Sequence, residues 1–363
     1  MQSKKTNYVD VIIPFFTPPF IGGTETVIRS WEKHLIGDIR EVKARFINVF
    51  QYKQDDFLEN YRGSKISYGK LFSSQNLVKK MGLIYLIYHL SVTKADTIIV
   101  LSPKYIKLAF YIRKILKKKY KIISWMHFSL SRMFVNEREA FLLADYHFAI
   151  SSGIKKQLQD FGVKSDKISV VYNPIKKVKK VVKVSARPRF LYVGRLEVKN
   201  QKNLNEMLKA IAEFKKSYND VLLEIWGDGI EREKLERIVR KLKIEDNVVF
   251  KGRVSNPWEK ISEGTALLLT STFEGLPMSI LEALSSGLPV ISSDIETGPR
   301  DEINNENGKL YKLGDIHQLV NKMEFVYTNP QKYPRKGVKE SITKFYEENY
   351  YYNIVNILKR VGS

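Results

Sequence analysis

The sequence predicts an α/β protein with two domains, each built on a parallel β-sheet. Short runs of β-branched and other apolar residues alternate with helical patterns along the 363 residues of the chain. This alternation is typical of βαβ units, in which helices cover both faces of a parallel sheet. It stops once, at the basic and proline-bounded stretch 173–190, and then starts again. A chain of this length is also more typical of two domains than of one.

In the first half, four apolar runs are expected to be buried strands, at residues 8–16, 96–102, 120–126 and 146–151. Helical patterns separate them, most clearly at 24–35 and 105–119. The apolar stretch from Met81 is about 12 residues long, short of the roughly 20 that a membrane span needs. We expect it to form a buried helix, with an interfacial helix as the alternative.

The second half repeats the pattern. Amphipathic helices are expected at 203–218 and 231–244, and a further helix begins near Met278 and stops at Gly287. The tail, 339–361, is expected to be one final helix with a dense tyrosine cluster. The strands expected in this half are 189–196, 221–229, 247–254, 265–272 and 289–294.

The charge of the chain is unevenly distributed. Lys plus Arg number 61 and Asp plus Glu 39, a net charge of +22. Residues 1–186 hold 33 basic and 14 acidic side chains (+19), whereas 187–363 hold 28 and 25 (+3). A basic half of this size implies an anionic partner, which could be nucleic acid, acidic lipid headgroups or a phosphorylated acceptor. The alternative is that these residues only form a solvated surface.

Several kinds of site are excluded. The chain has no cysteine, so it can form no disulfide and no thiolate metal site. It contains no Asp-x-Asp pair, no His-Glu-x-x-His and no Gly-x-Ser-x-Gly, so we expect no bound metal and neither zinc nor serine-hydrolase chemistry. The N-terminal apolar run is too short for a signal peptide, and we expect a soluble or peripheral protein.

The end of the expected strand 265–272 carries the most informative carboxylate. Glu274 follows this strand, and the helix behind it would present the free amides of Leu276, Met278 and Ser279. Ligands of open parallel sheets bind outside the carboxyl ends of the strands, and a helix N-terminus favours anions. Glu274 could therefore touch a polyhydroxylated ligand. It could equally be only a charge that stabilises the helix N-terminus.

Other strand ends carry weaker signals of the same kind. Gly22 and Gly23 open a helix after a proline-rich loop, and paired glycines allow close approach of a ligand. His127 lies at a strand end, although a lone histidine is more often a packed residue. A third strand is followed by basic residues suited to a diphosphate, Arg195, Lys199 and Lys202.

These stretches together resemble the retaining glycosyltransferases of family 4, which have the GT-B fold. The resemblance is carried by Gly22-Gly23, by "VGRL" with the basic residues behind it, by "GDG" at 227–229 and by the Glu-x7-Glu pattern from Glu274 to Glu282. Stretches such as "ISVVYNP" and "SSDIETGPRDEI" are similar to the bacterial lipopolysaccharide 1,6-galactosyltransferase group in particular. The resemblance covers nearly the whole chain.

The resemblance implies two Rossmann-like domains that face a central cleft. Residues 1–180 would bind the acceptor, with a C-terminal helix at about 343–363 packing back on them, and residues 181–342 would bind the donor. Glu274 and His127 would act at the transferred sugar, and Glu282 would hold the ribose. The family's second basic residue often falls where this chain has Gln201, so both Lys199 and Lys202 remain candidates. The remaining donor-binding residues implied are Gly22, Gly23, Arg195, Arg253, Gly275, Leu276, Pro277 and Met278.

The function implied is a retaining, metal-independent hexosyltransferase. It would need no cofactor, and would move galactose or glucose from a UDP-sugar to a cell-surface glycan, lipid-linked or protein-linked acceptor. The basic first half would dock on an anionic membrane surface, at the inner face of the plasma membrane in the cytoplasm. The alternatives are a non-catalytic protein that binds nucleotide sugars and a basic nucleic-acid-binding protein. No recognised nucleic-acid module supports the latter, so we expect no nucleic-acid partner.

Overall fold

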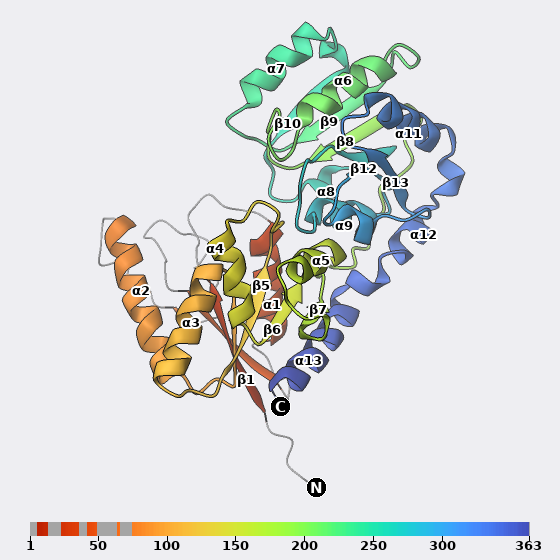
Figure 1. The fold of residues 1–363 in the computed structure, drawn as a ribbon. Helices are drawn as coiled ribbons and strands as arrows, with labels where there is room; N and C mark the ends of the chain where they lie inside the picture. The colour runs from red at the N-terminus through yellow and green to blue at the C-terminus, as the bar shows by residue number, and fades with distance from the viewer. Residues whose placement is uncertain (1–5, 14–22, 36–41, 49–63, 66–74, 363) are drawn as a thin grey trace. The chain divides into compact units, whose positions relative to one another are not determined.

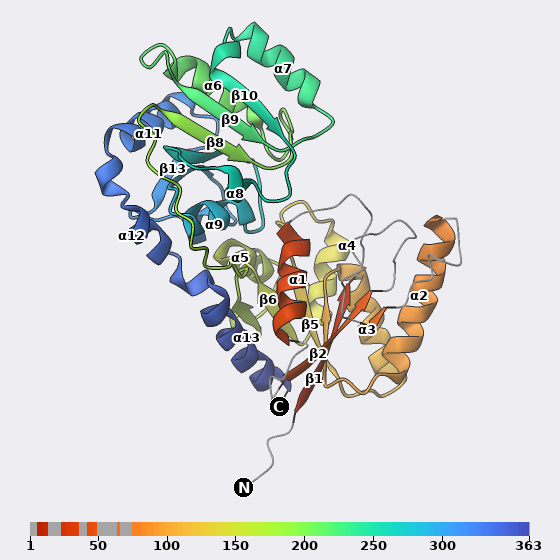
Figure 2. The ribbon, with the colours of Figure 1, turned by 180° about the vertical axis from the view of Figure 1, so that it is seen from behind.

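The computed structural model describes residues 6–13, 23–35, 42–48, 64–65 and 75–362 (Figures 1 and 2). The chain forms two compact units. One consists of Met1–Pro174 together with Tyr350–Ser363, and the other of Ile175–Asn349. The boundary between the first and second units therefore follows Pro174, slightly before the boundary after residue 180 that the sequence led us to expect.

The first unit contains a parallel sheet of seven strands in the order β3-β2-β1-β4-β5-β6-β7. Its central strands are almost wholly buried, which explains their continuous apolar sequences. The strands are β1 (Asn7–Ile13), β2 (Val42–Asn48), β3 (Ser64–Lys65), β4 (Thr97–Val100), β5 (Lys121–Met126), β6 (Tyr146–Ala149) and β7 (Ile168–Val170).

Helices lie on both faces of this sheet. Figure 1 shows α2 and α3 side by side on one face, and Figure 2 shows α1 on the opposite face. The C-terminal helix α13 joins α1, because the Trp31 indole donates to the Tyr350 hydroxyl at 2.8 Å. The helices are α1 (Gly23–Leu35), α2 (Gln75–Val92), α3 (Pro103–Ile115), α4 (Val135–Arg138), α5 (Ser152–Asp160) and α13 (Glu347–Gly362).

The second unit contains a parallel sheet of six strands in the order β10-β9-β8-β11-β12-β13. Its strands are β8 (Arg189–Val193), β9 (Leu222–Trp226), β10 (Val248–Gly252), β11 (Ala266–Leu269), β12 (Val290–Asp294) and β13 (Gly308–Lys312). Its helices are α6 (Leu204–Phe214), α7 (Arg232–Lys241), α8 (Pro257–Lys260), α9 (Met278–Ser285), α10 (Pro299–Glu302), α11 (Ile316–Thr328) and α12 (Arg335–Glu340).

The expected α/β class with two parallel sheets is confirmed, and each strand expected from the sequence is present. All have shorter bounds except the first, which the structure describes as Asn7–Ile13, while residues 14–16 of the expected strand lie outside the described part of the chain. The basic stretch after Pro174 packs along the second unit, where the Val182 amide donates to the Ser286 carbonyl. Two expectations are wrong. The tail is not one helix, because α12 and α13 are separated by a short 3-10 turn, Thr343–Phe345. The helix that contains 81–92 begins at Gln75 and is buried on one side only.

Candidate active site

The chain reverses its direction of travel across the second sheet between β8 and β11. These two strands pair side by side, although more than 70 residues separate them in the sequence. In a parallel sheet such a switch point leaves a crevice at the carboxyl ends of the strands, because the loops that follow them turn to opposite faces. The loop after β8 carries Arg195 to Lys202, and the loop after β11 carries Ser271 to Glu274. The topology therefore brings these two loops together.

The Glu274 carboxylate is the centre of the contacts between the two loops. It is only 6% exposed. Its Oε1 accepts from Lys202 Nζ at 2.7 Å and from Ser271 Oγ at 2.7 Å, and its Oε2 accepts from Gln201 Nε2 at 3.1 Å. A buried carboxylate needs this many donors, since an unpaired charge away from water is costly. Glu274 is thus a residue of the switch point and not a solvated helix-terminal charge.

The backbone around Glu274 is fixed as well. The Thr297 hydroxyl donates to the Glu274 carbonyl. Gly298, beside it, has φ of +96°, and a Cβ there would lie 2.6 Å from Cδ of Pro277. Only glycine fits this position, because the backbone conformation and the close approach both exclude a side chain.

Gln201 connects Glu274 to Arg195. Its amide nitrogen donates to Glu274, while its Oε1 accepts from Arg195 Nη2 at 3.1 Å. Arg195 also lies 3.5 Å from Glu197 Oε1, and its guanidinium remains largely exposed. The sequence marked Gln201 only as the residue that stands where a basic one is common. That Gln201 bridges Glu274 and Arg195 is evident only in the structure, where the loop after β8 lies against Glu274.

The "GDG" motif explains how Arg195 is held. The Gly194 amide donates to the Trp226 carbonyl, and the Leu196 amide donates to the Asp228 carbonyl. A Cβ at Gly227 would lie 1.9 Å from the Gly194 carbonyl oxygen. The turn after β9 can therefore lie close enough to accept these hydrogen bonds from the Arg195 loop only if residue 227 has no side chain.

Lys199 and Lys202 have different surroundings. The Lys202 side chain is largely buried by its ion pair with Glu274, whereas Lys199 is exposed. In the structure it is therefore Lys202 that lies at the carboxylate.

Glu282 has a different environment from Glu274. It lies on α9, and its Oε2 accepts from the Trp258 indole of α8 at 2.9 Å. Burial raises the pKa of Glu282 to about 7, and the bond from Trp258 offsets only part of this effect. Trp258 was not selected from the sequence, because a single tryptophan belongs to no motif and its partner is 24 residues away.

The N-terminus of α9 adjoins this region. Gly275, Leu276, Pro277 and Met278 are buried. The amides of Met278 and Ser279, the first two residues of the helix, have no acceptor within it. The helix ends as expected, at Gly287 with φ of +78°.

The other residues selected from the sequence are more scattered. His127 directly follows β5 in the first unit, with its ring 4.3 Å from that of Trp125. Both ring nitrogens are buried and lack a hydrogen-bond partner, and burial lowers the pKa of His127 to about 3. Buried polar groups without a partner are uncommon and need an explanation, and a bound ligand is one such explanation. Gly23 opens α1, Arg253 is an exposed residue after β10, and Gly22 lies outside the described residues.

The chain is similar in sequence to known proteins over nearly its whole length. The family model described as glycosyl transferases group 1 matches residues 175–343. A lipopolysaccharide 1,6-galactosyltransferase of Salmonella typhimurium is 35% identical over 348 residues, which are 93% of this chain and 95% of that protein. The chain belongs to the group 1 glycosyltransferases.

Solved structures agree with this assignment. The apo form of the lipopolysaccharide outer core galactosyltransferase WaaB is 32% identical, with a TM-score of 0.82 over 96% of this chain and 98% of that one. Anabaena Alr3699/HepE in complex with UDP-glucose is 16% identical, with a TM-score of 0.74 over 97% and 99% of the two chains, which is a likeness of fold. The fold of this glycosyltransferase is therefore GT-B.

In this glycosyltransferase the family match coincides closely with the second unit. Arg195, Lys202, Glu274 and Glu282 all lie within the matched residues. Among the described residues no group of three or more His, Asp or Glu side chains is arranged to hold a metal ion. The second unit instead offers two cations and a helix N-terminus beside a buried carboxylate, which is a chemically suitable set for a sugar joined to a diphosphate.

Proposed function

We propose that this glycosyltransferase is a retaining hexosyltransferase that uses a UDP-sugar. The observation that carries the proposal is the cluster at Glu274, where a buried carboxylate, Lys202 and the Arg195–Gln201 pair meet at the switch point of the sheet. A hexose presents hydroxyls to a carboxylate, and a diphosphate requires cations. A single small site that contains both fits a sugar diphosphate.

Each residue has a distinct proposed role. Glu274 binds hydroxyls of the hexose, and Glu282 accepts hydrogen bonds from the ribose. Arg195, Lys202 and the amides at the start of α9 neutralise the diphosphate as it leaves. Gly23 allows close approach of the donor, His127 contacts the sugar near its reacting carbon, and Arg253 flanks the base.

The reaction we propose retains the configuration at the sugar, as in family 4. The bond from C1 to the diphosphate oxygen breaks through an oxocarbenium-like state. The acceptor oxygen forms its bond to C1 on the same face, and its proton passes to the departing diphosphate. A nucleophilic carboxylate, as in retaining glycosidases, would be the other route. Accumulation of a glycosylated Glu274, detected by mass spectrometry, would establish that route instead.

The donor sugar is galactose or, second, glucose. The 1,6-galactosyltransferase of Salmonella typhimurium supports galactose. The complexes of Alr3699/HepE with UDP and with UDP-glucose support a uridine nucleotide. We further propose that the reaction needs no metal and no cofactor, because Arg195 and Lys202 supply positive charge at the diphosphate. Activity should then persist in excess EDTA, and a complete loss that Mn²⁺ or Mg²⁺ restores would contradict this.

The acceptor we propose is a lipopolysaccharide core, in line with the names of the relatives. No helix among the described residues is long and apolar enough to cross a membrane. The enzyme would act in the cytoplasm, and its basic first half would bring it to the anionic inner face of the membrane.

A panel of labelled UDP-hexoses tests the proposal. Transfer to a lipopolysaccharide that lacks its outer-core galactose should occur with UDP-galactose, and slow hydrolysis should occur without acceptor. The matched control is Glu274→Gln, which keeps the shape of the side chain but removes its charge. Binding of UDP-hexoses without turnover of any of them would instead indicate the non-catalytic alternative.

A further inference from the structure

Helix α2 has large apolar side chains on two opposite sides. One side is buried against the unit and includes Leu86, His89 and Leu90. The other side is exposed, with Ile84 at 58% and Tyr88 at 61% of their full surface. A helix that is apolar all round is usually either enclosed by protein or in contact with a membrane. Among the side chains of α2 that the structure describes, the exposed large apolar ones are Leu77, Leu83, Ile84, Ile87, Tyr88 and Val92.

The exposed side cannot be hidden by rotation of the helix. His89 Nε2 lies 2.9 Å from the carboxylate of Asp10, a fully buried residue of β1. Leu86 and Leu90, next to His89 on the same side, are fully buried. Turning α2 inward would break the Asp10 contact and expose both leucines. The fold therefore holds Ile84 and Tyr88 outward.

The neighbouring helix α3 extends this apolar side. Figures 1 and 2 show the two helices side by side, and they are in contact. On α3 the exposed positions Lys104, Tyr111, Lys114 and Ile115 follow helical spacing and form one stripe. Ile115 is among the most exposed large apolar residues of the described chain.

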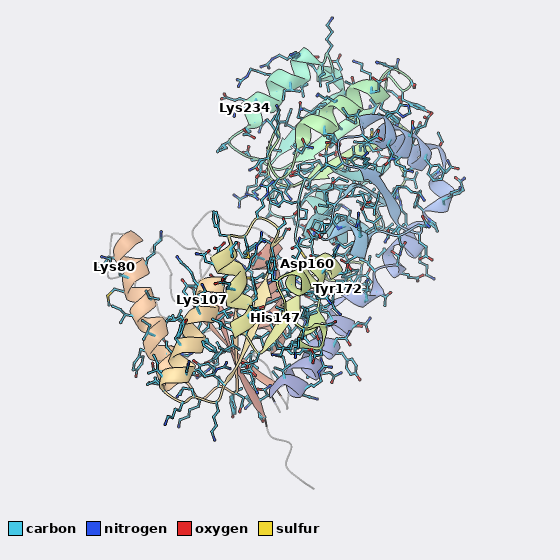
Figure 3. All side chains as sticks on the ribbon, in the orientation of Figure 1. Lys80, Lys107, His147, Asp160, Tyr172 and Lys234 are labelled. Carbon is cyan, nitrogen blue, oxygen red and sulfur yellow. The ribbon has the colours of Figure 1, made fainter. Side chains whose placement is uncertain are left out.

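Basic residues surround the apolar side chains. Residues 75–121 contain 11 Lys or Arg and a single acid, Asp96, which accepts the Tyr8 amide. Figure 3 labels Lys80 on α2, which is exposed, and Lys107 on α3, which donates to the Asn136 carbonyl at 2.7 Å. The exposed lysines of this segment are Lys79, Lys80, Lys94, Lys104, Lys114, Lys117, Lys119 and Lys121.

We propose that this α2–α3 face binds the surface of a bilayer that contains anionic phospholipid. The apolar side chains enter the interface, and the lysines contact lipid phosphates. The face is defined by Leu83, Ile84, Ile87, Tyr88, Tyr111 and Ile115 with the eight exposed lysines above. Its importance for catalysis rests on the proposed lipid-linked acceptor, but the surface itself does not depend on that proposal.

The composition favours a membrane over a protein partner. Protein interfaces are depleted in lysine, whereas lysine is the main polar residue here. Interfacial helices combine Leu, Ile and aromatic residues on one face with lysines, whose long stems let the ammonium groups reach the phosphates. The excess of ten positive charges in this segment is complementary to acidic headgroups.

Vesicle flotation tests both parts of the face. The wild type should float with vesicles of phosphatidylglycerol and phosphatidylethanolamine and not with phosphatidylcholine alone. Ile84→Ser with Ile87→Ser should weaken binding by about 10-fold or more, because two apolar side chains leave the interface. Replacing Lys114, Lys117 and Lys119 by Gln should weaken binding most at low salt, where charges are screened least.

Matched control substitutions on the second unit test whether the location of the changed residues matters, or only the net charge and exposed apolar surface of the protein. Replacing the exposed Lys209, Lys241 and Lys260 by Gln removes the same net charge. Ile230→Ser removes an apolar side chain that is 103% exposed. Neither should change flotation. If the lysine control weakens binding as much as the α2–α3 variant does, net charge alone attracts the protein and the proposed face is wrong.

The absence of cysteine allows a direct measurement of insertion. A fluorophore on the Ile84→Cys protein would occupy the only thiol in the chain, and Ile230→Cys provides the exposed control. With anionic vesicles, emission should shift to the blue for the label at position 84 and not for the label at position 230, and lipid-borne quenchers should reduce it. A blue shift without vesicles that grows with protein concentration would show that a second copy covers the face, and would overturn the proposal.

The two proposals fail in different ways. UDP-hexose hydrolysis, measured on the same samples without vesicles, reports the proposed function alone. A protein that hydrolyses donor but does not float leaves the function intact and removes the membrane face. A protein that floats but hydrolyses no UDP-hexose supports the membrane face and contradicts the proposed function. Circular dichroism of each variant excludes loss of folding as the cause.

Discussion

Glu274 and Glu282 lie eight residues apart, but their surroundings give them different properties. Glu274 accepts three side-chain hydrogen bonds, two of them from the loop that follows β8. Glu282 accepts a hydrogen bond from Trp258 and has an elevated pKa caused by burial. Glu274 therefore has donors at both carboxylate oxygens, while Glu282 is close to its titration point at neutral pH.

We expect Glu274→Gln to lower kcat by roughly 10²-fold or more with little effect on folding, if the carboxylate contacts the sugar in the transition state. Steady-state transfer kinetics with UDP-galactose would measure this. Ser271→Ala is a milder companion, because it removes one donor and leaves Lys202 and Gln201 in place. A Glu274→Gln enzyme within twofold of the wild type would exclude Glu274 from the mechanism.

The two candidate lysines can be separated by kinetics. We expect Lys202→Ala to lower kcat/KM by about 10²-fold, because it removes a cation from the carboxylate and from the site of the leaving diphosphate. Lys199→Ala, at an exposed position three residues earlier, should stay within a few-fold of the wild type. The reverse order of effects would assign the diphosphate to Lys199.

The elevated pKa of Glu282 predicts a pH-dependent affinity for UDP. The carboxylate accepts ribose hydroxyls better than the neutral acid does, so binding should tighten as pH rises through about 7. Calorimetric titrations between mildly acidic and mildly basic pH would show this step, and Glu282→Gln should remove it. A wild-type affinity that is flat across this range would mean that Glu282 does not bind the ribose in its charged form.

At the scale of the element, a buried ionic cluster joins α2 to the sheet. The Asp10 carboxylate accepts from Arg45 at 2.8 Å and from Thr93 at 2.6 Å, in addition to its contact with His89. Burial alone would raise the pKa of Asp10, but the hydrogen bonds from His89, Arg45 and Thr93 lower it overall. The cluster explains why the nearly wholly buried strand β1 tolerates a fully buried charge.

We expect Asp10→Asn to lower the free energy of unfolding of the first unit by about 3 kcal/mol, the cost of breaking a buried ion pair. Because the folded-state pKa of Asp10 lies below the ordinary 3.8, this stability is present above that pH and lost as pH falls below it. Urea denaturation at neutral and acidic pH would measure both effects. Asp160→Asn, at an exposed position on α5, is the control and should change nothing.

At the scale of the whole molecule, the chain returns to its first unit at its end. Residues from Tyr350 onward pack with the first unit, where Asn7 Nδ2 donates to the Leu358 carbonyl at 2.7 Å. The fully buried Trp31 contacts Tyr350 and Trp125. The last helix thus completes the core of the unit that begins the chain.

We expect Tyr350→Phe to destabilise the first unit by about 1 kcal/mol, because the Trp31 indole loses its acceptor. Tyr352→Phe, on the same helix but 72% exposed, should have no measurable effect. Thermal unfolding followed by near-UV circular dichroism would compare the two. Equal stabilities for both variants would show that α13 is held without this bond.

The sequence by itself determined the α/β class, the two parallel sheets and the carboxylates at 274 and 282. These follow from local patterns, namely apolar runs, helical spacing and a short motif after a strand. Only the tertiary structure decided that Lys202 and Gln201 meet Glu274, since β8 must pair with β11 to bring them together. It also decided that Trp258 reaches Glu282 and that Ile84 and Tyr88 of α2 face outward. Periodicity shows which residues are apolar, but their burial depends on which neighbouring elements cover them.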